Sequence, residues 1–376
     1  MHNPFIYPTN KIIGREREIN TVIGRIVTGQ STFISGSPRS GKTSILNCFS
    51  ANHDLYNDID TKLIFSEWNA GLCTPELTQI DFWKRVLIPL KEYIEDNEEL
   101  LNIYKKCEES NFKSHQIESL INKIKKAGLR LVVLIDRLDI LLKYDNFNNH
   151  EFFAGLRVKA SYGESAFVLV VTANISRNKF DEKTKGLVGS PYFNFMDEII
   201  LGALSDKTID EFLCKKQAKF EETDRNFIKN LAGGHPYLLQ IVASSLWEVR
   251  EYEMAVSSLE VREYENDIEK QYSAAESSSY AKAENTLTNI WMSWERDIQE
   301  VFSSIAFVQN RDKLNDKLNI EGIKKEIPNR KTELSELEKY GFIKKDDGDW
   351  CIYPSIFLQF MFFISKDEYK RDKYRA

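Results

Sequence analysis

The chain has 376 residues, of which 42% are hydrophobic and 29% are charged, and its formal net charge is −6 at pH 7. This composition is typical of a globular protein of roughly two or three domains, and it excludes a fibrous or low-complexity chain. An acidic balance gives no general sign of a surface for nucleic acids or for a basic membrane contact.

The five cysteines are scattered, and no pair has the spacing of a metal or redox motif. They are Cys48, Cys73, Cys107, Cys214 and Cys351. The N-terminus lacks the pattern of a signal peptide, and the most apolar window, 356–364, is too short to span a bilayer. We therefore expect a cytoplasmic protein with reduced thiols and no membrane partner.

After the stretch 12–19, an amphipathic helix is predicted that ends at about 27, and a short strand follows over 32–35. The next stretch reads Gly, four residues, Gly-Lys-Thr, and leads into a helical pattern, which is the full phosphate-binding P-loop pattern in its usual context. Its residues are Gly36, Ser37, Pro38, Arg39, Ser40, Gly41, Lys42, Thr43 and Ser44. We expect Lys42 to reach the β- and γ-phosphates of ATP (or ADP) and Thr43 to bind Mg²⁺.

Further along, a strand is predicted over 62–68 and helices over 76–95, 97–107 and 115–127. Five consecutive apolar residues, 131–135, then predict a strand that is buried on both faces, as in a parallel sheet. Asp136 follows this strand at the edge where α/β sheets bind ligands, so it is the second Mg²⁺ candidate. The alternative is an aspartate that begins a turn.

A helix near 149–160, an apolar strand over 166–171 and a shorter strand over 197–201 complete the alternation. Polar residues, Thr172 and Asn174, follow the apolar strand. Strands that alternate with helices across 31–202 predict an α/β fold with a doubly wound, mostly parallel sheet.

From 205 to about 290 only helices are predicted, and an Ala/Ser-rich stretch, 273–279, is interpreted as a junction between subdomains. The part over 295–365 has the order helix, helix, helix, β-hairpin, helix, which is the order of a winged helix. The predicted domains are a P-loop domain (1–204), an all-α lid (205–290) and a C-terminal winged-helix domain (291–376).

A winged helix usually suggests DNA, but here the third helix is rich in carboxylates, which phosphates would repel. Its acids are Glu333, Glu336 and Glu338, beside Arg330, Lys331 and Lys339. Basic residues lie on the hairpin and the tail, at Lys344, Lys345, Lys370, Arg371, Lys373 and Arg375. The pattern favours a packing module over a DNA reader.

Several segments together resemble the AAA-like branch of the STAND ATPases, which are related to AAA+ and origin-recognition ATPases. They are Asn3-Pro4-Phe5 with 13–16, the P-loop, the Walker B-like strand 131–136, the passage 190–205, and the Gly-x-Pro lid motif in 233–240. The resemblance implies that Ile12, Ile13 and Arg15 border the adenine and that Pro236 closes over it. It also implies a sensor at Asn174, or else at Thr172. Arg157 and Arg177 are candidates for a sensing or trans-acting arginine, with ordinary surface charges as the favoured alternative.

One position departs from the family. The Walker B strand of the family usually ends Asp-Glu, and the Glu polarises the attacking water, whereas here Arg137 follows Asp136. An arginine cannot act as a base. Asp139 is the expected substitute, with Glu67 a weaker one, and neither is expected to position water well. We therefore predict tight binding of ATP and Mg²⁺ with slow or absent hydrolysis.

Two function classes follow. The first is a nucleotide-dependent switch that assembles as a homo- or hetero-oligomer and acts through a separately encoded effector or sensor protein, and the resemblance suggests a role in defence against phage. The second is an initiator-type ATPase that loads or remodels DNA through the winged helix. A small-molecule kinase lacks any visible acceptor motif.

Overall fold

The structure is a computed structural model that describes residues 3–5, 12–51, 60–161, 166–184, 192–214, 218–258, 268–310 and 320–366. By its contacts the chain divides into two compact units. The sheet unit consists of Arg15–Gly36 and Gly41–Leu201, and the helical unit consists of Met1–Gly14, Ser37–Ser40 and Gly202–Ala376. The finer division into three domains stays a prediction.

The sheet unit is built on a parallel sheet whose strands, within the described residues, have the order β2-β3-β4-β1-β5. The strands are β1 (Thr32–Gly36), β2 (Lys62–Asn69), β3 (Leu129–Asp136), β4 (Phe167–Ala173) and β5 (Asp197–Leu201). Pairing aligns Asn69 with Asp136 and Ser35 with Ala173. The carboxyl ends of the strands therefore meet at one edge, and the predicted doubly wound α/β fold is confirmed.

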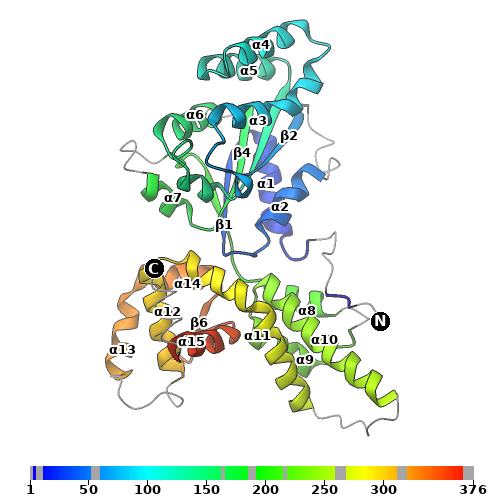
Figure 1. Cartoon of the computed structure of the whole chain (residues 1–376), viewed down its shortest axis with the longest axis vertical. Helices are drawn as coiled ribbons and strands as arrows, with labels where there is room; N and C mark the ends of the chain where they lie inside the picture. The colour runs from blue at the N-terminus through cyan, green and yellow to red at the C-terminus, as the bar shows by residue number, and fades with distance from the viewer. Residues whose placement is uncertain are drawn as a thin grey trace. The chain divides into compact units, whose positions relative to one another are not determined.

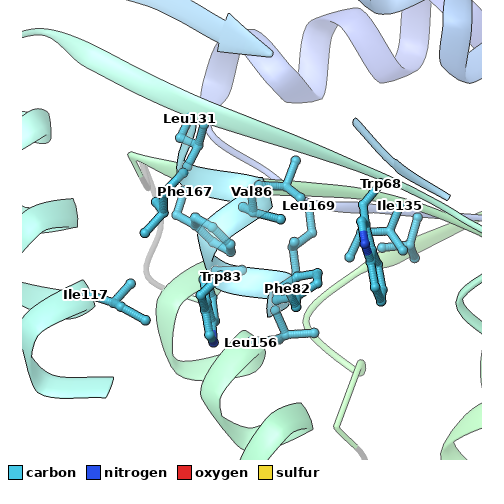
Figure 2. Packing of buried hydrophobic residues seen from close by; sticks show 14 of the residues in the cluster. Trp68, Phe82, Trp83, Val86, Ile117, Leu131, Ile135, Leu156, Phe167 and Leu169 are labelled. Atoms are coloured by element: carbon cyan, nitrogen blue, oxygen red, sulfur yellow. The ribbon is translucent and has the colours of Figure 1, made fainter. Parts of the chain in front are cut away.

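Side chains that alternate along β3 and β4 divide between the two faces of the sheet. Figure 2 shows Phe82, Trp83 and Val86 of one helix against Leu131 and Leu169, on the face that carries the large aromatic cluster. Residues of opposite parity on the same strands, Val132 and Val170 among them, are equally buried but lie outside that cluster. Burial on both faces explains why these strands read as continuous apolar runs.

Helices cover the sheet and join its strands, as Figure 1 shows. The described ones are α1 (Glu16–Thr28), α2 (Lys42–Ala51), α3 (Gln79–Ile94), α4 (Glu98–Glu109), α5 (Ser114–Lys126), α6 (His150–Ala160) and α7 (Arg177–Thr184), with short 3-10 helices η2 (Ala70–Leu72) and η3 (Leu138–Lys143). Thr78 and Asp81 form a capping box that fixes the start of α3. The sequence did not predict α7, because its eight polar-rich residues carry no apolar stripe.

The helical unit contains the elements predicted after 205, in the predicted order. They are α8 (Asp206–Leu213), α9 (Glu222–Ala232), α10 (Pro236–Ser258), α11 (Ile268–Ser293), α12 (Arg296–Gln309), α13 (Ile320–Glu326), η6 (Ile327–Asn329), α14 (Lys331–Lys339), β6 (Ile343–Asp346), β7 (Asp349–Ile352) and α15 (Ile356–Lys366). From α12 onward this is the helix, helix, helix, hairpin, helix order of a winged helix. In the part of the chain that the structure describes, no helix has the length and apolar run of a membrane span.

The interpretation of 273–279 as a junction was wrong, because the stretch lies inside the continuous helix α11. Ala275 and Ser279 are fully buried, and the Ser278 hydroxyl donates to Ser245 Oγ of α10 at 3.4 Å. Figure 1 shows the two helices side by side. The small residues allow α10 and α11 to pack closely. Composition alone does not distinguish a stretch of this kind from a linker.

The segment that follows β5 is held between two glycine turns of the helical unit. A Cβ on Gly234 would lie 2.6 Å from the Ala203 Cβ, and one on Gly341 would lie 2.5 Å from the same atom. A Cβ on Gly202 would meet the Lys339 carbonyl at 2.3 Å. The turn before α10 and the turn after α14 therefore pack on one backbone segment, which links the lid-like and winged-helix-like elements.

The N-terminal motif also belongs to the helical unit. Asn3 donates from Nδ2 to Ser244 Oγ and to Glu248 Oε1, both at 2.9 Å. Phe5 is buried and stacks on Phe220 at a centroid distance of 5.5 Å. These contacts anchor Asn3 on α10 and Phe5 on the segment just before α9.

Candidate functional site

Two residues of the loop that joins β1 to α2 have a positive φ. Gly41 has φ 99°, in the region that favours glycine, and Arg39 has φ 60° without being a glycine. The left-handed conformation costs a non-glycine residue roughly 1–2 kcal/mol, so contacts around Arg39 must hold it. Ser40 is buried, and among the described residues no group bonds its hydroxyl.

Lys42 begins α2 and reaches back over the loop, where its Nζ donates to the Gly36 carbonyl at 2.8 Å. Burial lowers the pKa of Lys42 to about 8, against the opposing effect of the Asp139 and Asp136 carboxylates. The loop thus holds a buried cation with two acids within electrostatic range.

Asp136 lies at the end of β3 and is the centre of a hydrogen-bonded group. The Thr43 hydroxyl donates to its Oδ2 at 2.8 Å, and the Thr172 hydroxyl donates to its Oδ1 at 2.6 Å. Thr172 lies on β4, on the same face as Asp136, because both side chains have the parity that points away from the aromatic cluster. The structure therefore brings together the two predicted Mg²⁺ ligands, Thr43 and Asp136.

Arg137 leaves β3 in the left-handed conformation, with φ 62° and ψ 51°. Its N–H donates to Thr172 Oγ1 at 2.9 Å, which ties this turn to the Asp136 group. The side chain is exposed and lies along η2, where a Cβ added to Gly71 would be 3.4 Å from Arg137 Nη1. The position after Asp136 thus presents a cation beside the end of β2.

Asp139 follows on η3, and its Oδ1 accepts the Asn174 N–H at 3.2 Å. Burial raises the pKa of Asp139, while the Asn174 N–H and the Lys42 and Arg137 cations act in the opposite direction. Two of the predicted catalytic residues, Asp139 and Asn174, are therefore brought together, through the backbone of Asn174.

Other candidates have structural partners elsewhere in the sheet unit. Glu67 lies two residues before the end of β2 and accepts a hydrogen bond from Ser50, seven residues along α2 from Thr43. That offset is about 10 Å along a helix, so Glu67 is not brought to the Asp136 group. Arg177 donates to the Met196 carbonyl at 2.6 Å, which fixes the start of α7 near β5.

The residues expected to border the adenine are divided between the two units, with Ile13 and Pro236 in the helical unit and Arg15 in the sheet unit. Arg15 is buried and pairs with Glu18 at 3.2 Å in α1, and burial lowers its pKa. Ile13 belongs to the helical unit, next to Gly14, whose φ is 74° and whose added Cβ would meet Thr208 of α8. Pro236 is the first residue of α10, where its fixed φ suits a helix start. Ser190 and Pro191, part of the predicted passage into the lid, lie outside the described residues.

The sequence did not indicate two side chains that flank Pro236. The Nε2 of His235 lies 3.1 Å from the Pro38 carbonyl oxygen, and the Arg39 guanidinium lies over the Tyr237 ring, 4.3 Å from its centroid. All four residues belong to the helical unit, since the loop tip Ser37–Ser40 groups with it. The signal that the sequence offers for these contacts is a histidine and a tyrosine close after the Gly233-Gly234 pair.

No protein-family model matches the chain, and no curated protein matches it in sequence. Among solved structures it is similar to the Walker-type ATPase PABY2304 of Pyrococcus abyssi, with 14% identity, a TM-score of 0.56, and coverage of 95% of this chain and 98% of that one. It is also similar to the ORC2 protein of Aeropyrum pernix in its ADPNP–ADP complexes, with 11% identity, a TM-score of 0.56, and coverage of 99% and 97%. The chain has the fold of the P-loop AAA-like ATPases.

Proposed function

We propose that the chain is an ATP- and Mg²⁺-binding switch of the AAA-like class that hydrolyses ATP slowly or not at all. The observation that carries the proposal is the hydrogen bond between Thr43 Oγ1 and Asp136 Oδ2 at the mouth of the loop that holds Lys42. A hydroxyl and a carboxylate are hard oxygen ligands of the kind that Mg²⁺ takes when phosphates supply further oxygens.

The loop itself suits a chain of phosphates. Lys42 supplies a buried positive charge, and Ser40 supplies a buried hydroxyl for which the described residues offer no partner. The first turn of α2 adds N–H groups and the positive end of the helix dipole. The fold shared with a Walker-type ATPase and with an ORC2 protein in ADPNP–ADP complexes supports the same ligand.

The expected rate of hydrolysis follows from the residues around Asp136. Arg137 stands where a glutamate base is expected and turns along η2. Asp139 has one carboxylate oxygen engaged by the Asn174 N–H. A missing general base typically costs a factor of about 10²–10⁴ in rate. ATP bound in this site is therefore expected to persist.

A persistent ATP suits a switch better than a fast enzyme. In this proposal Ile13, Arg15 and Pro236 border the base, Asn174 senses the γ-phosphate, and the bound nucleotide selects one arrangement of the chain. A separately encoded protein reads that arrangement. The role in defence against phage stays an expectation of the family resemblance.

The alternative is an initiator-type ATPase that binds DNA. The charges of the winged-helix elements argue against it, because Arg330 pairs with Glu300 and Glu333, each at 3.3 Å. Lys344 and Lys345 lie over aromatic rings of the hairpin region, at 4.0 and 5.0 Å from the centroids. The basic tail, 370–375, lies outside the described residues. Micromolar binding to duplex DNA that weakens steeply with salt would favour this alternative.

The direct test of the proposal is titration with a fluorescent ATP analogue in the presence of Mg²⁺. We expect a micromolar or tighter Kd for the unmodified chain and a loss of at least about 30-fold for Lys42→Ala, since a charge-assisted phosphate contact is removed. Absence of binding by the unmodified, folded chain would refute the proposal.

A further inference from the structure

The tip of the phosphate-binding loop is contacted by two residues at the start of α10, His235 just before the helix and Tyr237 in its first turn. His235 is buried, its Nδ1 accepts the Leu238 N–H at 3.4 Å, and its Nε2 lies 3.1 Å from the Pro38 carbonyl oxygen. An imidazole that accepts at Nδ1 carries its proton at Nε2 when neutral. His235 therefore donates from Nε2 to the Pro38 carbonyl.

This bond also orients the next amide of the loop. In a planar trans peptide the C=O and the following N–H point in opposite directions. Because the Pro38 carbonyl points at His235, the Arg39 N–H points away from it. A loop that binds phosphate needs its N–H groups turned inward and its carbonyls turned outward.

A second contact holds the neighbouring residue. The Arg39 guanidinium lies 4.3 Å from the centroid of the Tyr237 ring, an arrangement in which a cation is attracted by the ring face. Arg39 has φ 60°, a conformation that needs support from its surroundings. Tyr237 supplies such support from the first turn of α10, two residues after His235.

We propose that His235 and Tyr237 are positioning residues for the phosphate-binding loop, which they hold at the Pro38 carbonyl and the Arg39 guanidinium. The proposal rests on the proposed function of the loop and adds a requirement for two side chains of the Gly-Gly-His-Pro-Tyr turn that do not touch the nucleotide. They act by keeping the loop in its phosphate-binding shape before the nucleotide arrives.

Matched variants separate the two contacts from general packing. His235→Gln keeps a side-chain N–H at about the reach of Nε2, whereas His235→Leu removes it. Tyr237→Phe keeps the ring face, whereas Tyr237→Leu removes it. Tyr237 is half-buried, so its variants are expected to fold, and circular dichroism of each variant checks this point.

The first measurement is amide hydrogen exchange, by mass spectrometry, of the peptide that covers 36–41 in the nucleotide-free chain. We expect exchange about fivefold faster in each Leu variant, the factor given by the loss of one ordinary hydrogen bond or cation–ring contact. In His235→Gln and Tyr237→Phe, the rate of amide exchange of this peptide should lie within about twofold of its rate in the unmodified chain.

The second measurement is titration with a fluorescent ADP analogue, for which each Leu variant should show a Kd about fivefold higher and the conservative variants no change beyond about twofold. Equal loop exchange and equal affinity in all variants would overturn the proposal, as would a His235→Gln variant that behaves like His235→Leu. If the unmodified chain binds no nucleotide, the proposed function fails, while the exchange measurement still decides whether the two residues hold the loop.

Discussion

At the scale of single residues, the Asp136 group gives the most direct prediction. Thr43→Val keeps the shape of the side chain but removes the hydroxyl that donates to Asp136, whereas Thr43→Ser retains it. We expect Thr43→Val to lose the dependence of ATP affinity on Mg²⁺, with a Kd about 10- to 100-fold higher, because a metal ligand is lost. Titration of ATP with Mg²⁺ and with EDTA measures both effects.

Thr43→Ser is the control and should bind as the unmodified chain does. If Thr43→Val and the unmodified chain respond equally to EDTA, then the Thr43 hydroxyl is not a metal ligand. That result would leave the phosphate loop in place and remove Thr43 from the proposed metal site.

A residue of the helical unit offers a prediction about stability. Asp224 is almost fully buried, and Arg250 binds it with two hydrogen bonds of 2.6 and 2.5 Å, while the Tyr272 hydroxyl adds one of 2.8 Å. Arg250→Met leaves a buried carboxylate without its cation, so it should lower the free energy of unfolding by about 3–5 kcal/mol. Urea denaturation followed by circular dichroism measures it.

Tyr272→Phe removes only one neutral donor from the same carboxylate, and its expected cost is about 1 kcal/mol. A loss as small for Arg250→Met as for Tyr272→Phe would mean that Asp224 finds another partner, and the account of this network would be wrong.

At the scale of elements, the segment between β5 and α8 is closely packed by its neighbours. Gly234→Ala would place a Cβ 2.6 Å from the Ala203 Cβ and 2.7 Å from the Leu204 carbonyl oxygen. Neither neighbour is the end of a flexible side chain, so we expect a loss of about 1–3 kcal/mol, as for other overpacked sites. Thermal unfolding detects such a loss as a lower Tm.

Gly24→Ala is the matched control, because nothing lies within 4 Å of an added Cβ at this position in α1. It should stabilise the chain by about 0.5–1 kcal/mol, since alanine is the better helix former. Equal Tm values for Gly234→Ala and the unmodified chain would contradict the close packing of this junction.

Elements also show how much the sequence could predict. The continuous apolar runs of β3 and β4 predicted the sheet, because a strand that is buried on both faces is apolar along its whole length. The Gly-Lys-Thr pattern before α2 predicted the loop, because phosphate binding requires certain residues at a fixed spacing. The helix α7 was missed, and 273–279 was interpreted as a junction although it lies inside a helix, because polar and small residues leave no such pattern. The bond from His235 to Pro38 joins residues 197 positions apart, which no local pattern reports.

At the scale of the whole molecule, a switch must respond to its nucleotide. We expect the chain to elute differently in size-exclusion chromatography with ATP than with ADP, and to differ in its pattern of limited proteolysis, because the two nucleotides select different arrangements. Lys42→Ala, which should bind both nucleotides much more weakly, is the control, and at nucleotide concentrations below its Kd it should elute alike with ATP and with ADP. Identical elution and identical proteolysis of the unmodified chain would argue against a switch.

The central claim is that the site holds ATP without hydrolysing it quickly, and the fate of bound ATP tests it directly. The chain is loaded with ATP and Mg²⁺, freed of excess nucleotide, and its bound nucleotide is analysed over an hour beside an Arg137→Glu variant. We predict that the unmodified chain retains mostly ATP, and that Arg137→Glu, which restores a carboxylate after Asp136, converts it to ADP at least about tenfold faster. Rapid conversion to ADP by the unmodified chain would contradict the account.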